Sequence, residues 1–491
     1  MFSVLKISGV RLKILPEHKT GNIIRNMQGE YMTEAGNNYS EKKTQLHISV
    51  RNLVEFIFRE GDIDNRSSRA MSADAMMEGT RIHRKIQGSM GKEYQAEVPL
   101  SLVVEGDLYE LTVEGRADGI FTEDGKCFVD EIKGMYRKVE LFEKPVFVHR
   151  AQAMCYAYIF ALQNNMETIG IQMTYCNLET EQTKYFREEF SFEEIKKWFD
   201  DLMEEYGKWA TFQCEMKNQR QASIKELDFP YEYRPGQKKL VSDVYRTIMR
   251  QKLLFMQAPT GVGKTISTIF PAVKAVGEEL ADRIFYLTAK TITATVAKET
   301  FALLEKNGYR AKTIQITAKE KLCPCDEMEC NPVTCPYAKG HFDRVNDAVF
   351  DLLHRCEMIE RDDILLQADR YTVCPFELCL DTASWCDNVI CDYNYVFDPN
   401  VYLKRFFQEG IKGDYIFLID EAHNMVERSR QMYSAQIYKE DFLTVKRIMK
   451  EHSRSIEKAL EKCNKILLGM KRECENYMVY DTFGNMVFSF M

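Results

Sequence analysis

The chain has 491 residues, 45% of them apolar and 29% charged, which gives it the length for two to four domains and the composition of an ordinary globular protein. Its net charge of −8 excludes a protein that coats nucleic acid with its whole surface, so any nucleic-acid site must be a local basic groove. No apolar run reaches the ~20 residues of a membrane span, and the N-terminus lacks the long apolar core of a signal peptide. We therefore expect a cytoplasmic protein with no membrane contact, in which clustered cysteines are metal ligands or reactive thiols.

The first predicted domain, residues 1–212, alternates strand-like and helix-like patterns and is expected to be α/β. A hairpin is predicted over residues 109–133, because two alternating apolar runs flank a TEDG turn. The hairpin brings Asp118 near Glu131 and Lys133. Two carboxylates can then share Mg²⁺ or Mn²⁺, while the lysine positions or activates a water for attack on a phosphodiester.

Two helices are expected to complete this site. Upstream, the segment EGTRIHRKIQ places His83 on a helix that can supply an imidazole ligand, and a helix over residues 145–163 places Gln152 and Tyr156 one turn apart on the same face. The order of a histidine, an aspartate, an ExK pair and a QxxxY helix resembles the PD-(D/E)XK nucleases of the RecB type. The resemblance implies a metal-dependent DNA nuclease. Some fused domains of this kind keep the fold mainly to bind DNA, so a non-catalytic clamp stays as the alternative.

Three further regions follow. Residues 213–232 (QCEMKNQRQASIKELDFPYE) are polar and are expected to be a linker. Residues 233–438 carry the motifs of a nucleotide-binding domain. Residues 439–491 begin with a charged, glycine-poor stretch of helical period.

The segment APTGVGKT at Ala258–Thr265 follows a short apolar strand and is typical of a phosphate-binding loop. Gly261 and Gly263 allow the backbone to wrap a phosphate, so that successive amide groups and a helix N-terminus face the negative charge. Lys264 is expected to reach the β and γ phosphates of ATP, and Thr265 to hold Mg²⁺.

An acidic box, DEAH at Asp420–His423, ends a second apolar strand. Its carboxylates are expected at the carboxyl edge of a parallel sheet, where ligands of α/β proteins bind. Asp420 then belongs to the Mg²⁺ shell, and Glu421 orients or deprotonates the attacking water. Upstream of the loop, Gln237 of the sequence RPGQ is expected to contact the adenine edge.

RPGQ, APTGVGKT, the segment YLTAKT at 286–291 and DEAH together resemble the first RecA-like domain of superfamily 2 helicases of the XPD and DinG branch, as does the segment CDYNYVFDP before the acidic box. The resemblance covers ~200 residues. It implies an ATP-dependent, 5′ to 3′ DNA helicase acting in DNA repair or in the processing of foreign or branched DNA. It also places His423 at the nucleotide site and Lys290 and Thr291 on the backbone of single-stranded DNA.

Nine of the fifteen cysteines lie between Thr291 and Asp420. Zinc ribbons usually show two close CxxC knuckles, which are missing here. Irregularly spaced thiolates from loops suit an iron–sulfur cluster. Zinc and uncoordinated core cysteines stay as alternatives.

The same resemblance implies a [4Fe–4S] cluster in an insertion over about residues 315–380. Matched to the motif of the branch, its ligands are Cys323, Cys335 and Cys374, with Cys330 preferred to Cys325 as the fourth. We expect the cluster to brace a small domain and to form a wedge where strands separate. The other cysteines of the region are expected to pack as small buried residues, namely Cys356, Cys379, Cys386 and Cys391.

After His423 the remaining residues are too few for the second RecA-like domain of a complete motor, and they resemble the start of the helical arch of this branch. We therefore expect a truncated chain that binds ATP–Mg²⁺ but hydrolyses ATP poorly by itself. The preferred function is an iron–sulfur DNA helicase fused to a nuclease, with single-stranded or branched DNA as its partner. The alternative is a nucleotide-switched DNA-binding adaptor.

Overall fold

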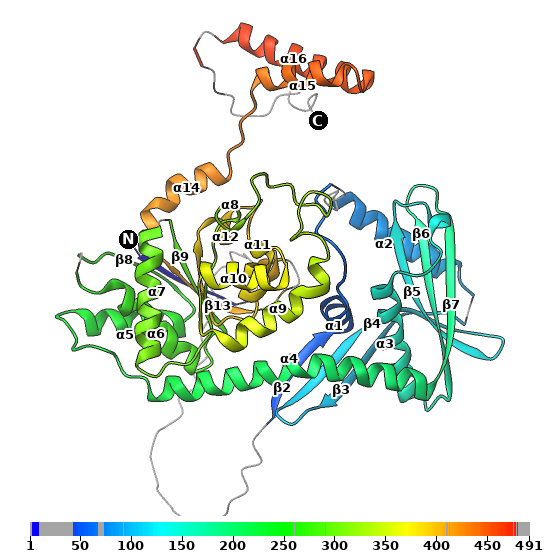
Figure 1. Cartoon of the computed structure of the whole chain (residues 1–491), viewed down its shortest axis with the longest axis horizontal. Coiled ribbons are helices and arrows are strands. Elements are labelled where there is room, and N and C mark those ends of the chain that lie inside the picture. Colours follow the sequence, from blue (N-terminus) through cyan, green and yellow to red (C-terminus); the bar gives the residue numbers. More distant parts are fainter. Residues whose placement is uncertain are drawn as a thin grey trace, which may run out of the picture. The chain divides into compact units, whose positions relative to one another are not determined.

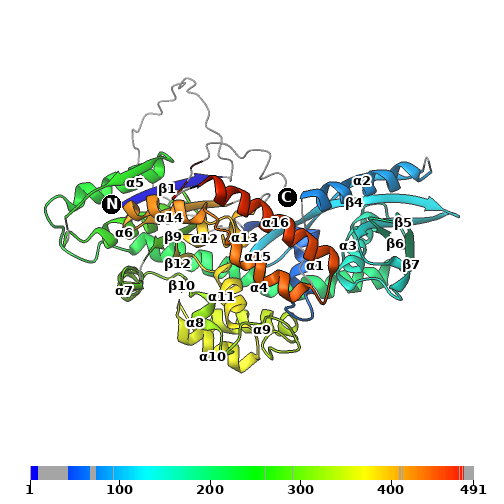
Figure 2. The same cartoon turned by 90° about the horizontal axis from the view of Figure 1, so that it is seen from above.

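A computed structural model describes residues 2–8, 43–66, 73–91, 93–259, 261–289, 291–408, 411, 413–474, 476–477 and 479. The chain forms two units. The first comprises residues 1–396 and 403–423 and contains two sheets, and the second comprises residues 397–402 and 424–491. In the described part, no helix is both long and apolar enough to cross a membrane. Two views of the elements are given in Figures 1 and 2.

One sheet of the first unit is built from the N-terminal half of the chain. Its described strands are β2 (Thr44–Ser49), β3 (Gln95–Glu105), β4 (Tyr109–Glu123), β5 (Lys126–Met135), β6 (Thr168–Asn177) and β7 (Thr183–Ser191). They follow the order β2-β4-β5-β6-β7, and β3 pairs with β4. The predicted hairpin is confirmed as the antiparallel pair of β4 and β5. Its turn residues Asp124 and Gly125 both have positive φ, of 52° and 79°, which is the geometry that two-residue hairpin turns favour.

Helices α1 (Val50–Ile57), α2 (Ala73–Ser89) and α3 (Phe147–Gln163) belong to this half, together with the short helix η1 (Val139–Leu141). Helix α3 connects β5 to β6, which run parallel. Most of α3 is buried, and small residues such as Ala153 and Ala157 let it approach the sheet closely.

The second sheet carries the nucleotide-binding motifs and has the strand order β11-β10-β12-β9-β13-β1-β8. Its strands are β1 (Phe2–Ser8), β8 (Leu253–Met256), β9 (Arg283–Thr288), β10 (Thr313–Gln315), β11 (Met358–Ile359), β12 (Asn388–Asp392) and β13 (Asp414–Ile419). Strand β1 runs antiparallel to both of its neighbours, β13 and β8. Residues 2–8, which the predicted boundaries place in the domain 1–212, therefore lie in the other sheet. There, the backbone N–H and C=O groups of β1 pair with those of β13 on one side and β8 on the other.

Helix α4 (Phe192–Glu226) corrects the predicted linker. The helix begins at a capping box of Ser191 and Glu194, as the sequence predicts, but it continues without a break through residues 213–226. This stretch is polar in composition and yet has no glycine or proline, and it buries Cys214, Arg220 and Ile224 along one side. The helix runs past both sheets in Figure 1, so the two halves share one 35-residue helix.

An aromatic cluster joins the two halves beside α4. The ring of Trp209 on α4 lies 4.9 Å from Phe56, 4.5 Å from Trp385 and 5.0 Å from Phe350, measured between centroids. Phe56 belongs to the N-terminal half, and the other two partners follow the phosphate-binding loop in sequence. Aromatic rings bury a large apolar area, so this contact stabilises the first unit as one body.

The remaining helices of the first unit surround the second sheet. They are α5 (Gln237–Met249), α6 (Lys264–Gly277), α7 (Thr291–Lys306), α8 (Lys319–Leu322), α9 (His341–Arg355), α10 (Arg361–Tyr371), α11 (Pro375–Ala383), α12 (Asn394–Phe397), α13 (Lys404–Phe407) and η2 (Ala422–Asn424), of which α12 and η2 extend by a residue into the second unit. Helices α8 to α11 lie within the predicted insertion and just beyond it.

The second unit is helical in its described part, as the sequence predicts for this region. Its helices are α14 (Met425–Met432), α15 (Lys439–Met449) and α16 (Arg454–Glu473). Helices α15 and α16 pack together, with Lys446 Nζ 3.5 Å from Glu461 Oε2. The unit begins at Asn424, earlier than the predicted boundary at residue 439. The chain leaves the second sheet where β13 ends at Ile419. The boundary between the two units therefore falls before the predicted residue 439.

The contact of α4 with α6 gives a test of this joint. A Cβ atom on Gly277 would lie 2.3 Å from Ile224 Cγ2, so we expect Gly277→Ala to lower the free energy of unfolding by about 1–3 kcal/mol. Ile224→Ala removes the obstructing atoms, and the double variant should be more stable than the sum of the two single effects predicts. Gly88→Ala, where nothing lies within 4 Å, is the control and should not destabilise. Chemical denaturation measures the free energy of unfolding of the parent and the four variants. Strict additivity of the two single effects in the double variant would contradict the contact.

Candidate functional site

The phosphate-binding loop connects β8 to α6. Gly261 and Gly263 have φ values of 84° and 79°, which side chains with a Cβ rarely adopt, and Gly263 is the N-cap of α6. Lys264 and Thr265 open the helix, so its free N–H groups face the loop. A cavity of ≈450 Å³ beside the loop is lined by Gly263 and Thr265, with the half-exposed ring of Tyr231 at its border. The loop therefore has the backbone shape and the adjoining space that a nucleotide requires.

The structure places Gln237 against the loop instead of leaving its amide exposed. Gln237 is 3% exposed, and its Nε2 donates to Val262 O at 3.1 Å. Its Oε1 accepts from the backbone N–H of Arg234 at 3.0 Å, and the Arg234 guanidinium donates to Gly261 O. The side chain that the sequence assigns to adenine contact thus supports the loop in this structure.

Thr265 and Asp420 come together across a third side chain. Tyr286 on β9 donates its hydroxyl to Asp420 Oδ2 at 3.1 Å and also hydrogen-bonds with Thr265. Burial and Glu421 raise the pKa of Asp420, while the Tyr286 hydroxyl and Lys264 oppose the shift. The two predicted Mg²⁺ ligands are therefore neighbours, and Tyr286 connects them. Sequence spacing gives no signal for this bridge, because β9 and β13 become neighbours only in the sheet.

Glu421 follows at the carboxyl end of β13 in a strained backbone conformation, with φ of 49°. Its carboxylate Oε2 lies 3.3 Å from His423 Nδ1. The backbone carbonyl of Asp420 accepts a hydrogen bond from Tyr393, which belongs to the segment CDYNYVFDP. This segment therefore supports the acidic box directly.

The predicted DNA-contact residue Lys290 lies outside the described residues, as does the side chain of Thr291. A cavity of ≈500 Å³, lined in part by Thr288 and Ala289, opens at the carboxyl ends of β9, β10 and β12. Its lining includes Lys298, Lys321 and Tyr395. Cations beside an aromatic ring are typical of a groove that holds single-stranded nucleic acid.

The predicted cluster ligands line one small cavity. Cys323, Cys330, Cys335 and Cys374 surround ≈40 Å³, together with the lysine Lys319. Although burial opposes it, hydrogen bonding to Cys330 and the nearby Cys374 raise the pKa of Lys319. In the described part of the chain, no group of three or more His, Cys, Asp or Glu side chains is arranged so as to hold a metal ion, either around this cavity or at the β4–β5 hairpin. The four predicted ligands nevertheless line one cavity, and four thiolates are the donor set of a four-iron cluster.

Cys325 stays beside this cavity as the alternative ligand. Its Sγ lies 3.9 Å from Cys335 Sγ, and burial together with Cys335 raises the pKa of Cys325 to about 12. Of the cysteines expected to pack, Cys379, Cys386 and Cys391 are buried and Cys356 is partly exposed. The structure thus separates the packing cysteines from those that line the cavity.

The N-terminal half brings its predicted site residues together at the β4–β5 hairpin. Asp118 Oδ1 lies 3.6 Å from His83 Nδ1, and Asp118 Oδ2 accepts the N–H of Ile132 at 2.7 Å. On β5, Glu131 Oε1 lies 2.6 Å from Lys133 Nζ, because residues two apart on a strand share a face.

Helix α3 extends this group. Lys133 Nζ lies 3.4 Å from Gln152 Oε1, and Gln152 hydrogen-bonds with Tyr156. Tyr156 lies against Gly115, where a Cβ would be only 2.5 Å from its hydroxyl. The chain from Glu131 to Tyr156 confirms that one turn of α3 faces the hairpin.

Glu131 is the carboxylate of this site that is almost completely buried and has a raised pKa. The side chain is 1% exposed, and its Oε2 has no hydrogen-bond partner in the structure. Burial, with a smaller contribution from Asp118, raises the pKa of Glu131 to about 8 even though Lys133 lowers it. A buried carboxylate oxygen without a partner is costly. It fits a divalent cation, which would supply the missing charge.

The neighbouring Asp130 has a different role, which the sequence does not separate from that of Glu131. It faces the opposite side of β5, where Tyr94 donates to it at 3.0 Å and Thr174 at 2.6 Å. Burial raises its pKa as well. With both oxygens hydrogen-bonded, Asp130 stabilises the sheet.

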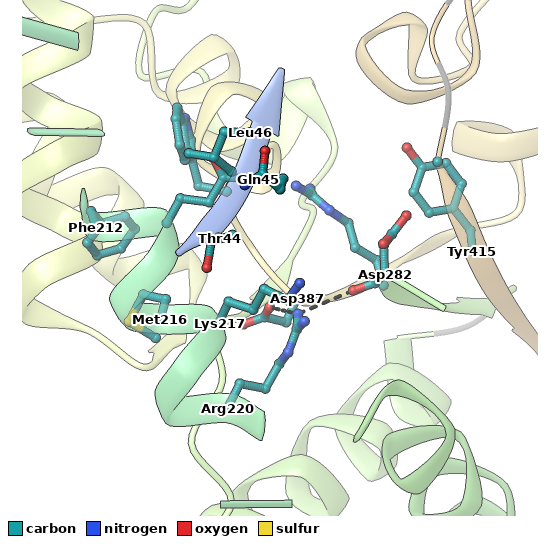
Figure 3. Close-up of a pocket in the computed structure, with 14 residues that line it drawn as sticks. Thr44, Gln45, Leu46, Phe212, Met216, Lys217, Arg220, Asp282, Asp387 and Tyr415 are labelled. Carbon is teal, nitrogen blue, oxygen red and sulfur yellow. Dashed lines mark hydrogen bonds and ion pairs between the residues drawn. The ribbon is translucent and has the colours of Figure 1, made fainter. Parts of the chain in front are cut away.

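A further cavity, of ≈370 Å³, lies between α4, β2 and the amino-terminal ends of β9, β12 and β13. Figure 3 shows Arg220 reaching from α4 to Asp387, with which it forms an ion pair, and toward Asp282, whose carbonyl it reaches at 3.3 Å. This edge of the sheet is opposite to the one that carries Asp420. The cavity therefore belongs to the joint between the two halves and lies away from the nucleotide residues.

Comparisons with known proteins agree with the nucleotide-binding half. Residues 303–442 match the DEAD_2 family model. The helicase subunit XPD/RAD3 of the general transcription and DNA repair factor IIH of Saccharomyces cerevisiae is 23% identical over 232 residues, which are 40% of this chain and 29% of that protein. The chain is thus similar, in this half, to superfamily 2 helicases of the XPD type.

Two solved structures complete the comparison. A truncated XPD is 15% identical, with a TM-score of 0.32, covering 51% of this chain and 72% of that one. An XPD helicase is 16% identical, with a TM-score of 0.31, covering 52% of this chain and 45% of that one.

The pKa of Glu131 predicts a pH effect on stability. Its folded-state pKa of about 8 exceeds the ordinary value of 4.5, so the folded protein binds more protons between these values and loses stability as the pH rises through them. In the absence of divalent metal, the melting temperature of the parent should fall more between pH 5.5 and 8.5 than that of Glu131→Gln, which cannot ionise. Glu114→Gln, at an exposed position on β4, should behave as the parent. Equal slopes for all three proteins would show that Glu131 titrates at its ordinary pKa.

Proposed function

We propose that this chain belongs to an ATP-dependent, 5′ to 3′ DNA helicase of the XPD and DinG type that carries a metal-dependent DNA nuclease in its N-terminal half and acts in DNA repair or processing. Residues 233–438 supply the ATP-binding half of the motor, and residues 43–226 supply the nuclease. The single observation that carries the nuclease is the buried, unpartnered Oε2 of Glu131 beside Asp118 and Lys133.

The motor site is proposed from the loop and the acidic box. Backbone amides at Gly261 and Gly263 and the ammonium of Lys264 bind the phosphates of ATP, while Tyr231 is placed to stack on the base. Thr265 and Asp420 hold Mg²⁺, which supplies charge for the phosphates when bound, and Tyr286 orients both side chains. Glu421 orients the attacking water, and His423 holds its carboxylate.

A DNA contact and a cluster site are also proposed in this half. Lys290 and Thr291, with the cavity that Thr288 and Ala289 line, bind the backbone of single-stranded DNA. The four cysteines around the small cavity hold a [4Fe–4S] cluster, which would supply the insertion with a rigid centre that its short helices do not provide. Lys319 then compensates the negative charge of the thiolates.

In the nuclease site, His83, Asp118 and Glu131 are proposed to hold Mg²⁺ or Mn²⁺, which polarises a scissile phosphate when bound. Lys133 lies between Glu131 and Gln152, so its ammonium is directed at the position of an attacking water. Tyr156 keeps Gln152 in place. Asp118 also accepts the N–H of Ile132, which prevents its side chain from rotating away.

Cleavage of labelled single-stranded DNA with Mn²⁺ tests the nuclease. Asp118→Ala and Lys133→Ala should each slow cleavage by about 10²–10⁴-fold, because each removes a group from the reacting centre. Lys126→Ala is the matched control, since Lys126 lies on the same strand but pairs with Glu189 at the surface. If the parent and both site variants were equally inert, the chain would be a DNA-binding adaptor with a degenerate nuclease fold.

A further inference from the structure

A short segment of the N-terminal half, residues 59–66, crosses to the cysteine insertion and is called the strap here. It follows α1 directly. Its first residue, Arg59, forms an ion pair with Asp381 at 2.7 Å and donates a hydrogen bond to Asn346 Oδ1 at 2.8 Å. The side chains of Arg59 and Asp381 are only 19% and 8% exposed, so the pair is shielded from solvent and less screened than surface pairs.

The strap then forms hydrogen bonds with the first turn of α9 and with the loop before it. Gly61 N donates to Asp343 Oδ1 at 2.7 Å, and Gly61 O accepts from Phe342 N at 3.0 Å. Asp62 Oδ1 accepts from Gly340 N at 2.6 Å. Ile63 N donates to Ala338 O at 2.9 Å. Three consecutive residues of the strap, Gly61 to Ile63, are thus hydrogen-bonded to the segment 338–343 of the insertion.

The strap ends at the cysteine cavity. Ile63 lines the cavity together with the four predicted ligands. Asn65 N donates to the backbone carbonyl of Cys330 at 2.9 Å. One wall of the cavity is therefore contributed by the N-terminal half.

On its other side the strap leads to the nuclease site. Helix α2 starts at Ala73, seven positions after Arg66, and carries His83 to within 3.6 Å of Asp118. Ile82 and Ile86 hold α2 on the sheet through a small apolar cluster. Its ion pairs with Glu181, made by Arg81 and Lys85, are largely exposed and contribute little. Because this apolar contact with the sheet is small, the position of α2 also depends on how the chain before the helix is anchored.

We infer that the strap makes the nuclease site depend on the cysteine cavity: an occupied cavity holds the strap, and the strap keeps α2 and His83 in register with Asp118. This inference rests on the proposed nuclease and cluster. It assigns residues 59–66 a role that neither active site includes.

Two cysteine variants test the dependence. The iron content of each protein is measured first. Cys374→Ser removes a cavity thiol and leaves every residue of the strap unchanged, whereas Cys356 lies outside the cavity and Cys356→Ser is the matched control. Amide hydrogen exchange over residues 77–89 should become faster in Cys374→Ser and stay unchanged in Cys356→Ser. Mn²⁺ binding at the nuclease site, measured by calorimetry, should weaken by about 10-fold in the first variant only, as when a group that orients a ligand is lost.

Two arginine variants test the strap itself. Arg59→Ala loses the contacts with the insertion, and Arg66→Ala loses only a pair with Asp64 within the strap. With the cavity occupied, Arg59→Ala should reproduce the fast exchange of Cys374→Ser, and Arg66→Ala should not. Circular dichroism and nucleotide binding report whether a variant is folded. If Cys374→Ser misfolds, removal of the cluster from the parent with an oxidant and a chelator gives the same comparison.

The outcomes separate this inference from the proposed function. Unchanged exchange over residues 77–89 after loss of the cavity metal would overturn the inference, whether or not the protein cleaves DNA. Absence of cleavage with faster exchange would leave the dependence standing and remove the nuclease. Zinc in place of iron would change the occupant of the cavity, and the exchange comparison would decide the dependence in the same way.

Discussion

The packing of α4 against the N-terminal sheet and against α6 of the nucleotide-binding half is the constraint on which the first unit depends. Its first half closes the core of the N-terminal sheet with Ile195 and Phe199, and its last turns bury Ile224 beside Gly277 of the helix that follows the phosphate-binding loop. A continuous α-helix is stiff over this length, so the halves it joins cannot rotate freely about each other. A flexible tether over residues 213–226 would leave the two candidate enzymes independent.

Each candidate site then lies where its chemistry can act without interfering with the joint. The nucleotide residues stand at the carboxyl edge of the second sheet, while the joint, with Arg220 and Asp387, occupies the amino-terminal edge. The nuclease residues stand on the β4–β5 hairpin, and the strap connects their supporting helix to the cysteine insertion. The proposed motor half and the proposed nuclease can therefore share one body.

Local motifs are the part of this molecule that a sequence can predict, because their chemistry is carried by neighbouring residues. The phosphate-binding loop, the hairpin with Asp118 and Glu131, and the capping box of α4 are of this kind. The bridge of Tyr286 between Thr265 and Asp420, the support of the loop by Gln237 and the crossing of the strap join segments that are distant in the chain. The prediction of a linker at residues 213–226 was wrong. A polar composition indicates exposure to solvent, but it does not exclude a helix that buries one side. Strand β1 belongs to a distant sheet for a similar reason, because pairing partners are set by the whole fold.

Hydrogen–deuterium exchange across α4 tests the central claim most directly. If α4 is one helix packed on both halves, amides over residues 207–224 exchange as slowly as those over residues 195–206, with and without ATP. Fast exchange confined to residues 213–224, at the rate of an unstructured peptide, would contradict the claim and restore a flexible linker between two independent domains.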